Sequence, residues 1–125
     1  MCRSQKITDA DVIAYNAPFP ESSYMCGPRM FPRLLPLTDA HPSVAANKEA
    51  WRRLAQYRKP FVTIWGPEDP ACTVAVCQQF IDTVPGAQGQ PHVKLEGAGH
   101  FVQEDDHEAV TRCILGHIAS NPTAT

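Results

Sequence analysis

The 125-residue sequence lacks the features that would place the chain in a membrane or on a nucleic acid. No apolar run approaches the length needed to cross a bilayer, and the first residues lack the apolar core of a signal peptide. The formal net charge is −2 and the basic residues form no cluster, so the charge pattern favours neither nucleic acid nor an anionic membrane surface. We therefore expect a soluble, cytoplasmic protein whose partners include no nucleic acid and no membrane.

The sequence also lacks the spacing of a disulfide framework or a zinc site. Its five cysteines are irregularly spaced, and neither Cys-x-x-Cys nor His-Glu-x-x-His occurs, so reduced thiols that pack as small side chains are the simpler interpretation. Cys113 and His117 lie four residues apart in an expected helix and could share a face as metal ligands, with a buried or surface role as the ordinary alternative. We expect no metal and no cofactor.

What the sequence does contain is a histidine that follows two closely spaced glycines. The segment 97–101, which carries His100, comes directly after the apolar strand pattern 93–95 and before the acidic segment 104–106. Gly97 and Gly99 let the backbone turn sharply as it leaves a strand, which presents an imidazole at the carboxyl edge of a sheet, where open α/β folds bind ligands. The pattern predicts a catalytic histidine on a loop, and a histidine that merely satisfies its hydrogen bonds in a turn is the alternative.

A second strand and loop, about thirty residues earlier, agree with this interpretation. The β-branched and aromatic run 61–65 ends in the turn 66–70, which carries Glu68 and Asp69. The two loops therefore place an acid and a histidine at the same relative position after two strands. This is half of a catalytic triad, with either acid as the partner of His100.

Apolar spacing and helix caps predict a sequence of helices around these strands. The expected helices cover residues 8–15, 24–31, 43–58, 73–84 and 104–120, and the rest of 18–42 is expected to be mostly irregular. The alternation of strands and helices predicts a parallel strand pair with a right-handed crossover. We expect the final helix to turn Val110, Ile114 and Ile118 toward the core, and His41 and His92 to be exposed.

Several segments, in this order, resemble the haloalkane dehalogenases of the α/β-hydrolase superfamily. The resemblance covers about residues 7 to 118, and the segments that carry it are Ala14–Pro20, Arg29–Pro32, Trp65–Pro70, Val84–His92 and Gly97–Glu104. It implies the C-terminal part of an α/β-hydrolase fold: the end of a helical cap, then helix, strand, helix, strand and helix with two parallel strands. The implied division is 1–42 for the end of the cap and an irregular pocket-lining segment, 43–120 for the α/β core portion, and 121–125 for a tail.

The resemblance also implies a set of catalytic roles. In such an enzyme an aspartate carboxylate attacks the halogen-bearing carbon and leaves an alkyl ester, and His100 is the base for the water that hydrolyses it. Asp69, at the position of the family's acid, orients His100, which makes Glu68 the second choice. The pocket residues are Phe31, Pro32 and Phe101, although each could equally be plain core. No Gly-x-Asp-x-Gly or Gly-x-Ser-x-Gly occurs, so the implied portion lacks the nucleophile.

Two parallel strands leave an open hydrogen-bonding edge. Only Thr63 is polar in the run 61–65, so we expect self-association or pairing with a part that supplies the rest of the sheet. Three functions follow from different classes. We favour a haloalkane dehalogenase-like hydrolase acting on small halogenated alkanes when complemented. The alternatives are part of an epoxide hydrolase or esterase, and a catalytically inactive remnant that serves as an interaction fragment.

Overall fold

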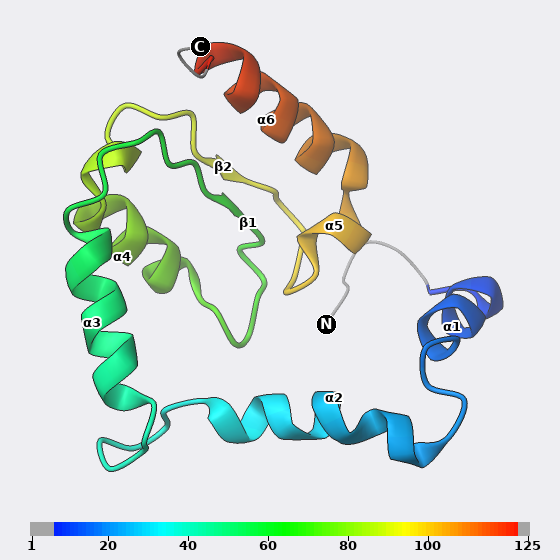
Figure 1. The fold of residues 1–125 in the computed structure, drawn as a ribbon. Helices are drawn as coiled ribbons and strands as arrows, with labels where there is room; N and C mark the ends of the chain where they lie inside the picture. Colours follow the sequence, from blue (N-terminus) through cyan, green and yellow to red (C-terminus); the bar gives the residue numbers. More distant parts are fainter. Residues whose placement is uncertain (1–6, 123–125) are drawn as a thin grey trace. The chain divides into compact units, whose positions relative to one another are not determined.

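The computed structural model describes residues 7–122, which divide into two compact units of residues 7–53 and 54–122 (Figure 1). Cys2 and the last three residues of the expected tail lie outside the described residues. No helix in the described range is both long and apolar enough to cross a membrane.

The first unit consists of short helical segments. Helix α1 (Asp9–Asn16) begins as expected, because Thr8 and Asp11 form a reciprocal capping box in which each backbone N–H donates to the other side chain. The segments that follow are η1 (Ser22–Met25), α2 (Cys26–Met30), η2 (Phe31–Leu34) and α3 (Val44–Leu54). The expected helix at 24–31 is therefore confirmed, but it continues through η2, and the region is less irregular than we predicted.

The second unit contains the strand pair. Its elements are β1 (Ile64–Trp65), α4 (Val74–Thr83), η3 (Pro85–Ala87), β2 (Val93–Lys94), α5 (Val102–Asp105) and α6 (His107–Ser120). Strands β1 and β2 are parallel, with Ile64 opposite Val93 and Trp65 opposite Lys94. The parallel pair and the order of elements confirm the expected α/β arrangement, in which the chain leaves both strands toward one edge of the sheet (Figure 1).

A small core lies around α4 and the segment that leads into β1. Cys77, Val84, Ala87 and Ala98 are its buried hydrophobic residues. The ring of Phe80 in α4 lies 6.1 Å from that of Phe61 and 6.4 Å from that of Trp65, measured between ring centroids. The turn after α4 packs closely against the chain before β1, where Gly86 donates to the Tyr57 carbonyl and accepts from the Phe61 N–H. These contacts hold the chain in place where it enters β1.

Three expected elements differ from the structure. The helix expected at 43–58 ends four residues earlier, at Leu54. The strand expected at 61–65 is only β1, because the Phe61 N–H bonds to the Gly86 carbonyl and the Thr63 N–H to the His92 ring instead of to a strand. The final helix is split at Asp106, whose backbone is not helical and whose side chain accepts from the Ala109 N–H at the start of a new helix.

Four expectations about burial are also wrong. Ile114 and Ile118, expected in the core, are 46% and 60% exposed within the described chain, although Val110 is partly buried. His41 and His92, expected to be exposed, are both partly buried and hydrogen-bonded through both ring nitrogens. Their partners are backbone and hydroxyl groups, some close in sequence, such as Ser43 for His41, and some distant, such as Thr63 for His92.

Candidate active site

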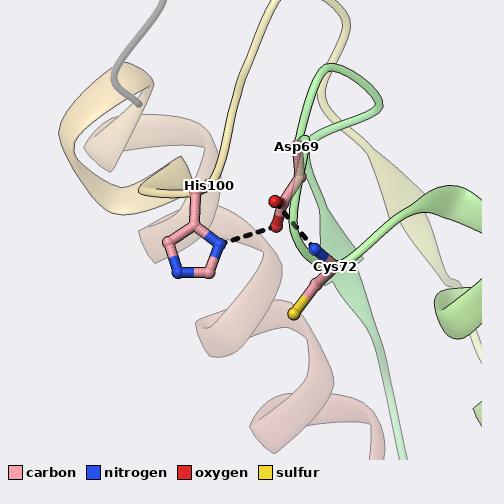
Figure 2. Close-up of side chains that lie close together, drawn as sticks. All are labelled: Asp69, Cys72 and His100. Atoms are coloured by element: carbon pink, nitrogen blue, oxygen red, sulfur yellow. Dashed lines mark hydrogen bonds and ion pairs between the residues drawn. The ribbon is translucent and has the colours of Figure 1, made fainter. Parts of the chain in front are cut away.

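His100 and Asp69 meet at the carboxyl ends of the two parallel strands. The Nδ1 atom of His100 lies 2.8 Å from Oδ2 of Asp69, although 31 residues separate them in the chain (Figure 2). The Asp69 side chain is 6% exposed and that of His100 is 33% exposed. An ionised carboxylate only accepts hydrogen bonds, so Nδ1–H donates to Asp69 and the lone pair of a neutral ring is left on Nε2.

Direct backbone contact between their two loops sets this distance. The Glu68 N–H donates to the Ala98 carbonyl at 3.1 Å, which joins the turn after β1 to the loop after β2. Gly66 permits the approach, because a Cβ atom at this position would collide with the Gly99 carbonyl oxygen and lie 2.6 Å from that of Ala98. Glycine at position 66 is thus needed for the histidine loop to approach this turn closely.

The Asp69 carboxylate is held by the turn that carries it. Its Oδ1 accepts from the backbone N–H groups of Ala71 and Cys72, at 2.8 and 2.9 Å. Burial alone would raise the pKa of Asp69, but the hydrogen bonds from Cys72, His100 and Ala71 together with the charge of a protonated His100 hold the pKa below its usual value. Asp69 is therefore ionised at neutral pH and able to stabilise an imidazolium.

The loop of His100 is fixed by a buried acid. Gly97 has a φ of +79°, which turns the chain after β2, and the Gly99 N–H donates to Oδ2 of Asp105 at 2.7 Å. Asp105 lies in α5 and is only 3% exposed. The side chain of this helix residue therefore orients the backbone immediately before the histidine.

A cavity of about 180 Å³ opens beside the pair. Its lining combines apolar side chains from the strand and from α5 with the acid, the histidine and a thiol: Ile64, Trp65, Gly66, Asp69, Cys72, His100 and Val102. Cys72 is positioned by the Trp65 indole, whose Nε1–H donates to the Cys72 carbonyl at 2.7 Å. The arrangement offers an oriented base at the wall of a small, mostly apolar hollow.

Comparison with known proteins identifies homologues of this chain. No family model matches the chain. A haloalkane dehalogenase of Psychrobacter cryohalolentis is 39% identical over 117 residues, which are 94% of this chain and 38% of that protein. One from Mycobacterium marinum is 45% identical over 111 residues, 89% of this chain and 37% of that protein. The chain is homologous to the C-terminal portion of haloalkane dehalogenases.

A solved structure supports the same relation at the level of the fold. The crystal structure of haloalkane dehalogenase DbeA from Bradyrhizobium elkani matches with a TM-score of 0.83 and 26% sequence identity, over 99% of this chain and 42% of that one. The chain thus has part of the haloalkane dehalogenase α/β-hydrolase fold. It spans little more than a third of the length of the curated dehalogenases it matches.

The structure brings together only some of the site residues that were predicted from the sequence of this dehalogenase homologue. His100 and Asp69 come together, whereas Glu68 is exposed on the same turn. Phe101 packs edge-on against the His100 ring, with 5.0 Å between ring centroids, but is not among the residues that line the cavity. Phe31, 72% exposed, and Pro32, also exposed, lie in the first unit, so their part in a pocket stays a prediction.

Two residues of the dehalogenase-like site were missed by sequence reasoning. Cys72 was interpreted with the other cysteines as a small packing residue, and Asp105 as one of three acids at a helix start. Position in the acid loop, three residues after Asp69, is a signal that could have singled out Cys72. Nothing in the sequence separates Asp105 from its acidic neighbours, because its role depends on a contact with Gly99.

Proposed function

We propose that this chain provides the acid and histidine of a haloalkane dehalogenase-like hydrolase, which cleaves carbon–halogen bonds through an alkyl–enzyme ester. The observation that carries the proposal is the 2.8 Å contact between His100 and Asp69, on loops after neighbouring parallel strands, in a chain homologous to haloalkane dehalogenases. The substrate class is small halogenated alkanes, and a cytoplasmic location stays a prediction.

His100 acts in the second half of this reaction. In the first half a carboxylate attacks the halogen-bearing carbon, the carbon–halogen bond breaks and halide leaves. Water then attacks the ester carbonyl while Nε2 of His100 takes its proton, and collapse of the intermediate returns the carboxylate and releases the alcohol with that proton. Asp69 holds the ring by Nδ1, so that Nε2 keeps its lone pair until the proton arrives.

The nucleophile of this scheme has no counterpart motif in the sequence. Neither Gly-x-Asp-x-Gly nor Gly-x-Ser-x-Gly occurs, so the attacking carboxylate is expected to come from a polypeptide that supplies the remaining portion of the fold. The apolar wall formed by Ile64, Trp65 and Val102 suits an alkyl chain. Phe31, Pro32 and Phe101 stay proposed as substrate-pocket residues.

Complementation tests this proposal. The purified chain is mixed with the separately expressed N-terminal portion of the Psychrobacter cryohalolentis relative, and halide release from 1-chlorobutane and 1,2-dibromoethane is followed. We expect release only in the mixture, and loss of turnover with trapped alkyl ester when the chain carries His100→Ala. A His107→Ala variant removes an exposed histidine from α6 and is expected to retain activity. No halide from a folded, associated mixture would refute the assignment.

A non-catalytic interaction fragment is the second candidate, and one observation favours it. Within the described residues β1 pairs only with β2, so its other edge offers unpaired backbone groups to an added strand. Binding of the N-terminal portion without halide release would support this function. Turnover of an epoxide or an ester by the mixture, without halide release from haloalkanes, would instead indicate the epoxide hydrolase or esterase alternative.

A further inference from the structure

We propose that Asp69, Cys72 and His100 form a binding site for Zn²⁺. Each residue presents one ligand atom of a kind that zinc prefers, a carboxylate oxygen, a thiol sulfur and an imidazole nitrogen, and these atoms all lie within 4.8 Å of one another (Figure 2). The three side chains come from two loops that the backbone holds together, so the cluster is a product of the fold and not of a local sequence motif.

The separations suit a tetrahedral ion after small adjustments. Zinc–ligand bonds of about 2.0 to 2.3 Å place neighbouring ligand atoms about 3.5 Å apart. Oδ2 of Asp69 and Nδ1 of His100 are 2.8 Å apart, so the ion replaces their hydrogen bond and the two atoms move apart by less than about 1 Å. The sulfur of Cys72 lies within 4.8 Å of the ligand atoms of both other residues.

Hydrogen bonds already hold the residues of the cluster in place without an ion. Oδ1 of Asp69 accepts from the N–H groups of Ala71 and Cys72, which leaves Oδ2 as the oxygen that faces the histidine. The Trp65 indole fixes the Cys72 carbonyl at 2.7 Å. Such outer hydrogen bonds orient metal ligands and reduce the ordering that the ion itself must impose.

Charge and access also favour a divalent cation. All three residues line the cavity of about 180 Å³, which leaves room for water as the fourth ligand, and the lining includes neither lysine nor arginine. Binding displaces the protons of the Cys72 thiol and of His100 Nδ1 to solvent or to Nε2, and the thiolate and the carboxylate then balance the two charges of the ion.

Zinc binding goes beyond the proposed hydrolase function and opposes it. The ion occupies the nitrogen through which Asp69 orients His100, so the metal-bound chain cannot act as the base. This consequence alone rests on the proposed function, and binding itself is tested on the isolated chain.

Titration with Co²⁺ as a spectroscopic substitute for Zn²⁺ tests the site. We expect one equivalent to give the thiolate-to-cobalt charge-transfer band and the visible bands of a four-coordinate ion, and excess Zn²⁺ to remove both. Cys72→Ser should abolish the charge-transfer band, and His100→Gln should weaken binding about tenfold or more. Cys26→Ser and Cys113→Ser remove thiols outside the cluster and should leave the spectrum unchanged. An unchanged spectrum in Cys72→Ser, or no binding by the unaltered chain, would overturn the proposal.

A second measurement needs no variant. The folded chain is treated with iodoacetamide with and without Zn²⁺, and alkylation of each cysteine is measured by mass spectrometry. Zinc should slow alkylation of Cys72 about tenfold or more while leaving exposed Cys26 unaffected. Equal protection of both cysteines, or of neither, would contradict a site at Cys72. Because neither experiment measures halide release, a failed dehalogenase assay leaves their result intact.

Discussion

The two oxygens of the Asp69 carboxylate have separate partners. Oδ1 accepts two backbone N–H groups of its own turn, and Oδ2 accepts the Nδ1–H of His100. One residue therefore both closes the turn after β1 and ties that turn to the histidine loop. Protonation of this carboxyl weakens all of these contacts together, because a neutral acid is a poorer acceptor.

The lowered pKa of Asp69 predicts how stability depends on pH. The unfolded chain takes up this proton near the ordinary value of 3.8 and the folded chain only at lower pH, so the contribution is fully present above about pH 4 to 5 and lost as pH falls through the folded pKa. We expect Asp69→Asn to be less stable than the parent at neutral pH, and the difference to shrink below about pH 4. Urea unfolding at several pH values measures it.

Glu96→Gln is the matched control for this experiment. It removes an exposed carboxylate from the turn after β2 but leaves the hydrogen bond between Asp69 and His100 in place. Its stability should follow that of the parent across the same pH range. An Asp69→Asn difference that stays constant on acidification would show that Asp69 acts through its shape and not through its charge.

Residue-level prediction succeeded where local sequence sets the geometry. Glycines before His100 and the turn that carries Asp69 are visible in sequence, and these two residues do come together. It failed for Asp105 and for His92, whose ring bonds to Thr63 and to the Ala87 carbonyl. Each bond links a side chain to a group outside its own helix or strand, so no spacing within one element reveals it.

At the scale of elements, the order along the chain was easier to predict than the boundaries. Helices α1 and α6 begin at side-chain caps, and α4 follows apolar spacing; both are local signals. Strand limits depend on which backbone groups pair, and in β1 the preceding N–H groups of Phe61 and Thr63 bond elsewhere. The split between α5 and α6 has a similar cause. The Asp105 side chain accepts from the Gly99 N–H, and the side chain of the next acid, Asp106, caps α6.

Contact between the two loops predicts a large effect of a small substitution. Gly66→Ala places a methyl group against the carbonyl oxygens of Ala98 and Gly99, which are backbone atoms that cannot rotate away. We expect a loss of about 1 to 3 kcal/mol in the free energy of unfolding, because the loops must separate. Chemical denaturation gives this value. The imidazole NMR signals of His100 should shift as well, since its bond to Asp69 spans the same two loops.

Gly116→Ala is the corresponding control. Gly116 lies within α6, and a Cβ atom there meets nothing within 4 Å. Alanine is the better helix former, so this variant should be more stable by about 0.5 to 1 kcal/mol. Gly66→Ala with unchanged stability and an unchanged His100 signal would mean that the loops are looser than their contacts indicate.

At the scale of the whole molecule, the fold class follows from the alternation of strands and helices, but burial does not. On α6, Ile114, Leu115 and Ile118 are 46 to 60% exposed within the described chain. Apolar side chains at helical spacing predict a buried face only if other elements are there to cover it. The chain spans little more than a third of its curated relatives, and the comparison with DbeA covers 42% of that protein. Apolar periodicity on α6 therefore does not by itself determine burial within the described chain.

The unpaired edge of β1 leads to a prediction about association. A hollow of about 250 Å³ lies beside β1. It is lined by residues 61–65 and Phe80, and none of these lining residues is charged. Natural edge strands are commonly blocked by charge, so the isolated chain should self-associate as its concentration rises. Val62→Lys should weaken this association about tenfold or more, equivalent to about 1.4 kcal/mol, because the added charges repel across a paired edge. Sedimentation velocity over a range of concentrations measures the effect, with urea unfolding to verify that the variant is folded.

Val12→Lys replaces a 47% exposed apolar residue on α1 with the same charge and should not change the association. Equal weakening by both variants would assign the effect to net charge, and a parent chain that stays monomeric at every concentration would show that its strand edge is already protected.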